Sequence, residues 1–84
     1  MATNEKTPGM GPFAAAIAAA VRSVVAGKDM SGSELARRLN RAQSYVSYRL
    51  NGHKSWTIDE VEQIAAILNI EADDVIDLAR KFYR

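Results

Sequence analysis

Cysteine is absent from the 84 residues of this chain, and histidine occurs only once, as His53. The lack of thiols excludes disulfides, thiolate nucleophiles and thiolate zinc sites, and it is consistent with a reducing compartment. A single histidine cannot form a metal site of the usual histidine-rich type. The acidic residues Asp73, Asp74 and Asp77 are typical of the start of a helix rather than of a metal cage. We therefore expect no metal, no other cofactor, no small-molecule ligand and no catalytic residue.

Long apolar runs are also missing. The alanine-rich segment from Phe13 to Ala26 is interrupted by Arg22 and is shorter than the roughly 20 apolar residues that a membrane span requires. The basic residue ahead of it, Lys6, lies beside Glu5, which is unlike a secretory signal. The sequence predicts a cytoplasmic protein without a membrane segment.

The charges are distributed unevenly along the chain, although the net charge is only +1. Residues 31–56 contain five arginine or lysine side chains and one glutamate, whereas residues 57–79 contain seven acidic side chains and no basic one. This separation indicates one surface that attracts an anion and another that is kept away from it. Ordinary solvated helix faces are the alternative that composition alone leaves open.

The apolar residues recur with the period of α-helices, and no segment alternates for long enough to predict a strand. Residues 1–11, with Pro8, Gly9 and Gly11, are expected to form a flexible tail. Residues 12–84 are expected to form one all-α domain of five helices. The first helix begins at Pro12 and ends near Gly27.

Capping signals predict where the later helices begin. Ser31 with Glu34, and Thr57 with Glu60, have the spacing of capping boxes. The fifth helix is expected to follow Glu71. The fourth helix is expected to bury Ile58, Val61, Ile64, Ala65 and Leu68. Trp56 is expected to cover the core under the loop that precedes this helix.

Two short helices with a tight turn between them lie at residues 32–52, in the segment ELARRLN-RA-QSYVSYRLNG. Leu35, Ala36 and Leu39 of the first helix are expected to face Val46 and Leu50 of the second, which begins at Gln43. This spacing is typical of a helix-turn-helix, whose second helix can lie in the major groove of DNA. Its outward side chains are then Gln43, Ser44, Tyr45, Ser47 and Tyr48.

The segments SELARRL, QSYVS, LNG and TIDEVEQIAAILNI resemble the lambda-repressor-like, or Cro/C1-type, helix-turn-helix proteins over roughly residues 14–78. The resemblance implies a five-helix lambda-repressor-like bundle that binds double-stranded DNA in a bacterial or phage-infected cell. It implies base contacts from Gln43, Ser44, Ser47 and Tyr48. It also implies phosphate contacts from Ser33 and from the loop residues His53, Lys54 and Ser55.

Three residues depart from the pattern of that family. Asn40 replaces the usual turn glycine, and asparagine tolerates the left-handed conformation that the turn requires. Arg41 stands at a position that is usually apolar, so we expect it to point outward, toward phosphate. Ala42 replaces the usual serine or threonine cap of the third helix, at a cost of about 1 kcal/mol.

Charge and position add Arg38, Tyr45 and Arg49 to the candidate phosphate contacts. Each has an alternative, because the arginines can pair with Glu34 or the acidic helices, and a tyrosine ring near a small core often packs on its neighbours. Ile76, Phe82 and Tyr83 of the last helix are candidate dimer contacts, with completion of the monomer core as the alternative.

The sequence therefore predicts a sequence-specific transcriptional regulator rather than an enzyme. The simplest form is a Cro-like or repressor-like protein of a phage or prophage that occludes a promoter, bound to DNA as a homodimer. The alternative is an antitoxin or accessory protein-interaction module with the same fold. The basic surface around the third helix separates the two, because only the regulator requires salt-sensitive DNA binding.

Overall fold

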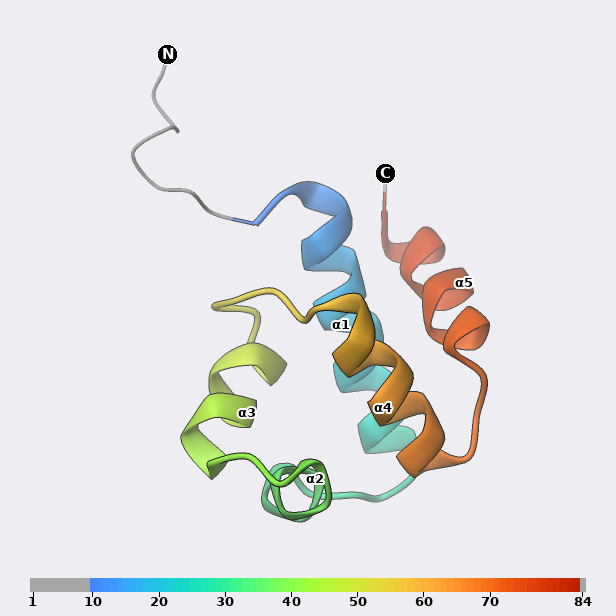
Figure 1. Ribbon diagram of the computed structural model, residues 1–84. Coiled ribbons are helices and arrows are strands. Elements are labelled where there is room, and N and C mark those ends of the chain that lie inside the picture. Colours follow the sequence, from blue (N-terminus) through green and yellow to red (C-terminus); the bar gives the residue numbers. More distant parts are fainter. Residues whose placement is uncertain (1–9, 84) are drawn as a thin grey trace.

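The computed structural model describes residues 10–83, and within them the chain forms helices and no strand (Figure 1). The helices are α1 (Pro12–Gly27), α2 (Gly32–Leu39), α3 (Gln43–Leu50), α4 (Ile58–Leu68) and α5 (Ala72–Phe82). This arrangement confirms the all-α fold class. The expected flexible tail falls on residues 1–11, of which residues 1–9 lie outside the described part of the chain.

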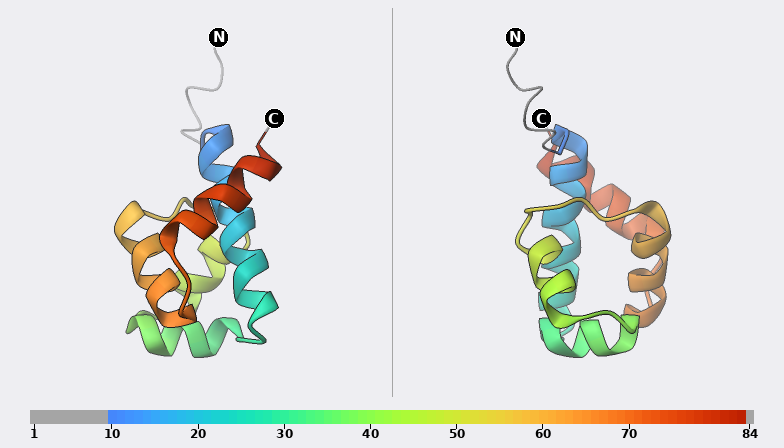
Figure 2. Two further views of the ribbon diagram at one scale, coloured as in Figure 1. Left: turned by 90° about the vertical axis from the view of Figure 1, so that its right-hand side faces the viewer. Right: turned by 60° about the vertical axis from the view of Figure 1, so that its left-hand side comes forward.

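The helices α3 and α4 lie on either side of α2, which is viewed end-on in Figure 1, and α1 lies behind them. Figure 2 shows that α5 crosses α1 and that the start of α1 and the end of α5 lie at the same end of the molecule. No helix among residues 10–83 is long and apolar enough to cross a membrane.

The most extensive helix contact joins α1 and α5. Pro12 occupies the first turn of α1, where its missing N–H leaves no hydrogen bond unmade. Ala20 and Val21 of α1 and Val75 and Ala79 of α5 are all fully buried. Alanine has little side chain to order and allows helices to approach closely, so the alanine-rich α1 serves as the central helix of this small core.

The helix ends follow the capping signals with one exception. Thr57 and Glu60 form the predicted capping box at the start of α4, and Asn40 ends α2 with a left-handed φ of 59°. Ser31 caps α2 by accepting the N–H of Glu34, but the Glu34 side chain does not reach back to Ser31. It binds Arg37 and Arg38 instead. Charge-assisted hydrogen bonds to guanidinium groups are stronger than one to a neutral backbone N–H, which corrects the expected box at this helix.

The expected buried face of α4 is correct except at its first residue. Val61, Ile64, Ala65 and Leu68 are buried, whereas Ile58 is 63% exposed. Trp56, which is 6% exposed, is the apolar side chain buried at this end of the helix. The core is therefore closed by the loop residue, as expected for Trp56, and Ile58 is left outside it.

Two isoleucines of α4 give a matched test of this core boundary. Replacing fully buried Ile64 by alanine is expected to lower the free energy of unfolding by about 2–5 kcal/mol, because it removes buried methyl groups and leaves a cavity. Replacing exposed Ile58 by alanine is expected to change it by no more than about 0.5 kcal/mol. Urea denaturation followed by circular dichroism measures both values. Equal losses for the two variants would show that the core extends to Ile58.

Candidate nucleic-acid interface

The turn between α2 and α3 is fixed by its backbone. After Asn40 the Arg41 N–H donates to the carbonyl of Ala36 at 3.0 Å, and Ala42 is extended at φ −61° and ψ 145° before α3 begins. Leu35 and Val46 are fully buried, and Ala36 is 3% exposed. One side of α3 is therefore covered by α2, so its opposite side is available to a ligand.

The four predicted base-contacting residues lie together on that opposite side of α3. Gln43, Ser44, Ser47 and Tyr48 are spaced so that they share one side of the helix, and all four are exposed. Ser47 Oγ accepts a long hydrogen bond of 3.5 Å from the side-chain amide of Asn51. The structure thus brings together amide, hydroxyl and phenol groups on a single helical surface.

The loop after α3 is held against the end of this surface. The ring of His53 stacks on that of Tyr48 with centroids 5.1 Å apart, and the His53 N–H donates to the Tyr48 carbonyl at 3.0 Å. Gly52 has a φ of 81°, in the left-handed region that favours glycine, and this conformation turns the chain. The exposed residues His53, Lys54 and Ser55 therefore continue the surface of α3 at its C-terminal end.

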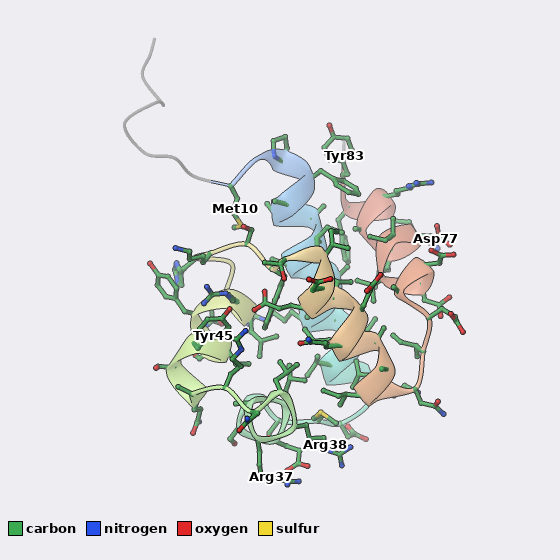
Figure 3. The ribbon with its side chains drawn as sticks, in the orientation of Figure 1. Met10, Arg37, Arg38, Tyr45, Asp77 and Tyr83 are labelled. Atoms are coloured by element: carbon green, nitrogen blue, oxygen red, sulfur yellow. The ribbon has the colours of Figure 1, made fainter. Side chains whose placement is uncertain are left out.

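The arginines of α2 are paired with a glutamate on the same helix. Glu34 Oε2 lies 2.5 Å from Arg37 Nη2 and 2.7 Å from Arg38 Nε. These hydrogen bonds from Arg37 and Arg38 lower the pKa of Glu34 to about 2. Arg38 therefore pairs with Glu34, one of the two intramolecular alternatives expected from the sequence. Figure 3 shows Arg37 and Arg38 on α2. Ser33 is exposed, with its Oγ 3.4 Å from Ser31 Oγ.

Tyr45 lies on the side of α3 that faces α4, apart from the four exposed residues (Figure 3). It is half-buried, and its hydroxyl donates a hydrogen bond to Oε2 of Glu60. The guanidinium of Arg49 lies 3.5 Å from the centroid of its ring, and that of Arg41 lies 4.7 Å from it. Both distances are in the range of cation–π attraction. Tyr45 therefore packs on its neighbours, which is the alternative to the phosphate contact expected from the sequence.

Glu60 is a buried carboxylate, 5% exposed, that joins two helices. Its Oε1 accepts the Thr57 N–H at 2.8 Å, and its Oε2 accepts the Tyr45 hydroxyl. Burial raises the pKa of Glu60, but the hydrogen bonds from Thr57 and Tyr45 and the charge of Arg49 outweigh burial and hold the pKa below its usual value. The sequence predicted only its capping role, because Glu60 is 15 residues away from Tyr45.

The acidic residues of α5 lie on a different side of the molecule from α2 and α3. Figure 3 shows Asp77 projecting from α5, away from the arginines of α2. Glu71, Asp73 and Asp74 stand at the start of α5, where Asp74 accepts the Glu71 N–H at 2.9 Å and the helix dipole favours negative charge. The acidic residues of α5 are therefore separated in space from the arginines of α2, whereas Glu60 of α4 lies 4.0 Å from Arg41.

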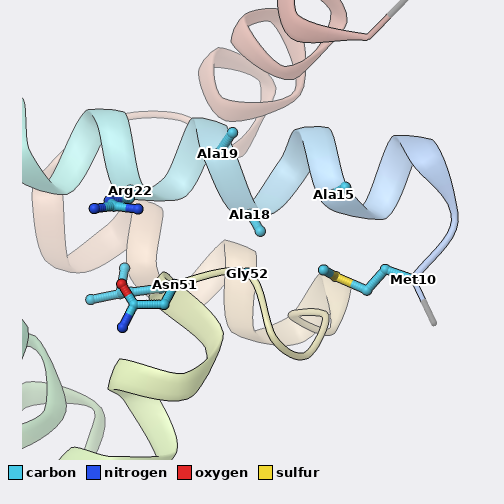
Figure 4. Close-up of a pocket in the computed structure, with 8 residues that line it drawn as sticks. Met10, Ala15, Ala18, Ala19, Arg22, Asn51 and Gly52 are labelled. Atoms are coloured by element: carbon cyan, nitrogen blue, oxygen red, sulfur yellow. The ribbon is translucent and has the colours of Figure 1, made fainter.

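A pocket of about 220 Å³ lies between α1 and the end of α3 (Figure 4). Met10, Ala15, Ala18, Ala19 and Arg22 line its α1 side, and Leu50, Asn51 and Gly52 line the other. None of the predicted DNA-contacting residues lines it. It is therefore a separate feature from the α3 surface.

The candidate dimer residues divide into two kinds. Phe82 and Tyr83 are 47% and 44% exposed, and the Tyr83 ring meets that of Phe13 edge-to-face with centroids 5.4 Å apart. Ile76 is half-buried and packs against the monomer core. An exposed aromatic cluster of Phe13, Phe82 and Tyr83 thus lies where α1 begins and α5 ends.

The hydrogen bond to Glu60 raises the pKa of Tyr45, with burial adding to the effect. We expect its phenol to titrate above the usual value of about 10. The variant Glu60→Gln should bring that pKa down, because the amide no longer stabilises the protonated phenol as a carboxylate does. The chemical shift of the Tyr45 ring carbons, followed against pH by NMR, measures both. An unchanged midpoint in the variant would show that the two side chains are not coupled.

Comparison with known proteins places this geometry in a family. A crystal structure of the clp gene regulator ClgR from C. glutamicum superposes with a TM-score of 0.77 at 24% identity, covering 93% of this chain and 99% of that chain. No curated protein matches the sequence at a significant level. The model of the helix-turn-helix family matches residues 22–75, which include α2, α3 and α4 in full. The chain therefore belongs to the Cro/C1-type helix-turn-helix family of DNA-binding regulators.

Proposed function

We propose that this protein is a sequence-specific repressor that places α3 in the major groove and occludes a promoter. The observation that carries the proposal is the set of four exposed polar side chains on the side of α3 opposite to the contact with α2. A major groove about 12 Å wide admits an α-helix. Because α2 braces the rear of α3, these side chains can meet base edges without unfolding of the core.

Each group on that side of α3 has a partner on DNA that suits its chemistry. The Gln43 amide can pair with N6 and N7 of adenine through two hydrogen bonds, and the hydroxyls of Ser44 and Ser47 can bond to bases or phosphates. The ring of Tyr48, which is 52% exposed, suits the methyl group of thymine. The specificity is then carried mainly by Gln43, at the first turn of α3.

Phosphate contacts are proposed on both flanks of α3. Ser33 and Arg38 of α2 lie on one flank, and His53, Lys54 and Ser55 of the loop lie on the other. Arg49, in the last turn of α3, and Arg41, just before the helix, add positive charge there. Tyr45 is left out of these contacts because its hydroxyl is already bonded to Glu60. Such contacts position the protein and supply salt-sensitive affinity rather than sequence preference.

Replacing Gln43 by alanine is expected to weaken binding to the preferred duplex by about 1–3 kcal/mol and to leave binding to unrelated duplexes nearly unchanged. The preferred duplex is obtained by selection from random DNA with the unmodified protein. Fluorescence anisotropy with both duplexes measures the difference. The matched control is Gln63→Ala, at an exposed position of α4, which should alter neither affinity.

An equal loss on both duplexes would remove Gln43 from base recognition. If the unmodified protein shows no salt-sensitive binding to any duplex, the proposed function is wrong, and the protein-interaction module becomes the better hypothesis.

We further propose that two copies bind together, with their α3 helices about 34 Å apart in successive major grooves. The exposed aromatic cluster of Phe13, Phe82 and Tyr83 supports this contact, because large exposed apolar groups that gather in one place are typical of protein interfaces. The half-buried Ile76 contributes at the edge of the contact.

The dimer proposal predicts a palindromic selected site and a two-to-one complex of protein and duplex. Replacing Phe82 by alanine should weaken the two-to-one complex with only a modest loss of monomer thermal stability, because Phe82 is 47% exposed. Sedimentation of the protein with the labelled duplex measures the stoichiometry. An asymmetric site that is filled by one copy would contradict the dimer.

A further inference from the structure

One buried carboxylate connects the recognition helix to the rest of the domain. Glu60 accepts the hydroxyl of Tyr45 from α3 and the N–H of Thr57 at the start of α4. Its Oε2 also lies 4.0 Å from Nη2 of Arg41. No other acidic side chain among residues 10–83 is buried. A buried charge carries a large desolvation cost, so the contacts that compensate it constrain all the groups that take part.

Arg49 of α3 and Arg41, just before α3, depend on this carboxylate through the tyrosine ring. Arg49 lies over the ring and donates from Nη1 to the Tyr45 carbonyl at 3.2 Å, while its Nε is buried with no hydrogen-bond partner in the described residues. Arg41 also lies near the ring, and its side chain is 49% exposed. Tyr45 thus holds both guanidinium groups, and Glu60 holds Tyr45.

We infer that Glu60 is a positioning residue for DNA binding, which fixes α3 against α4 through Tyr45 and keeps Arg41 and Arg49 ordered beside the DNA-reading surface. The inference rests on the proposed function, because it assigns these two arginines to the phosphates that flank α3. An arginine that has lost its anchor must be ordered again to reach a phosphate, and this entropic cost leaves the phosphate contact formed for only part of the time. Glu60 therefore increases affinity without touching DNA.

The sign of one mutational effect separates this role from simple electrostatics. A carboxylate near DNA repels the phosphates, so through-space repulsion alone predicts tighter binding when its charge is removed. The positioning role predicts weaker binding, because Tyr45 and the two arginines lose their anchor. The two explanations give opposite results for the same substitution.

The test compares Glu60→Gln with Glu62→Gln, which makes the same chemical change on the same helix at an exposed position. Glutamine keeps the length of the side chain and can still accept the Thr57 N–H. A third variant, Tyr45→Phe, keeps the ring between the arginines and removes only the hydroxyl. Fluorescence anisotropy with the selected duplex, over a series of salt concentrations, gives the dissociation constant and its salt dependence for each protein.

Glu60→Gln is expected to weaken binding about three- to tenfold, and Tyr45→Phe is expected to weaken it in the same direction. The plot of log affinity against log salt should become shallower by about one unit for each phosphate that the arginines no longer neutralise. The double variant should bind no more weakly than the weaker single variant, because both substitutions break one hydrogen bond. Glu62→Gln should bind as tightly as the unmodified protein or more tightly.

Binding by Glu60→Gln that equals that of Glu62→Gln would overturn the inference, as would a loss of affinity with an unchanged salt slope. Thermal melting by circular dichroism confirms that each variant is folded at the assay temperature. If Glu60→Gln is unfolded there, Tyr45→Phe decides by the same two criteria. Failure of the unmodified protein to bind any duplex would refute the proposed function instead, so the two failures are distinct.

Discussion

The contact between α2 and α3 is the constraint on which the DNA-binding surface depends. Ala36 is buried at 3% exposure between the two short helices, and its small side chain allows Val46 to be fully buried beneath α2. The left-handed conformation of Asn40 sets the direction in which the chain leaves α2. With one side of α3 fixed in this way, the residues at Gln43, Ser44 and Ser47 can only face outward. The surface that we propose for DNA contact is thus a consequence of the surface that meets the core.

Much of the fold could be predicted from the sequence because its signals are local. Three of these signals act over only a few residues. The apolar spacing predicted the helices, Thr57 and Glu60 form the expected capping box, and Asn40 adopts the expected left-handed conformation. The failures arose where one group had several partners within reach. The Glu34 carboxylate had a backbone N–H and two guanidinium groups within reach. It accepts hydrogen bonds from the guanidinium groups of Arg37 and Arg38, because charged donors bind a carboxylate more strongly. Ile58 was expected to be buried because it fits the apolar spacing of α4, but it is 63% exposed. Apolar spacing identifies one side of a helix and does not determine at which residue the core ends.

The site was predictable to a similar extent and for the same reason. The exposed side of α3 follows from helical periodicity once Val46 is assigned to the core, whereas the bond from Tyr45 to Glu60 requires the tertiary placement of α4. One local signal was present, because Arg41 and Arg49 each stand four residues from Tyr45, a spacing that brings side chains together on a helix or at its start. That signal predicts the stacking of the arginines. It does not predict the carboxylate, which belongs to another element.

The packing of α1 against α5 has a consequence for how the domain is made. These helices come from opposite ends of the described chain, so the entropy of closing a long loop must be overcome before they meet, whereas α2 and α3 are neighbours. Among the five described helices, α1 is synthesised before the others and α5 after them. Until then α1 lacks the helix with which it makes its most extensive contact. On the ribosome the helix-turn-helix is therefore complete in sequence before α1, which packs against α3, has gained its most extensive helix contact.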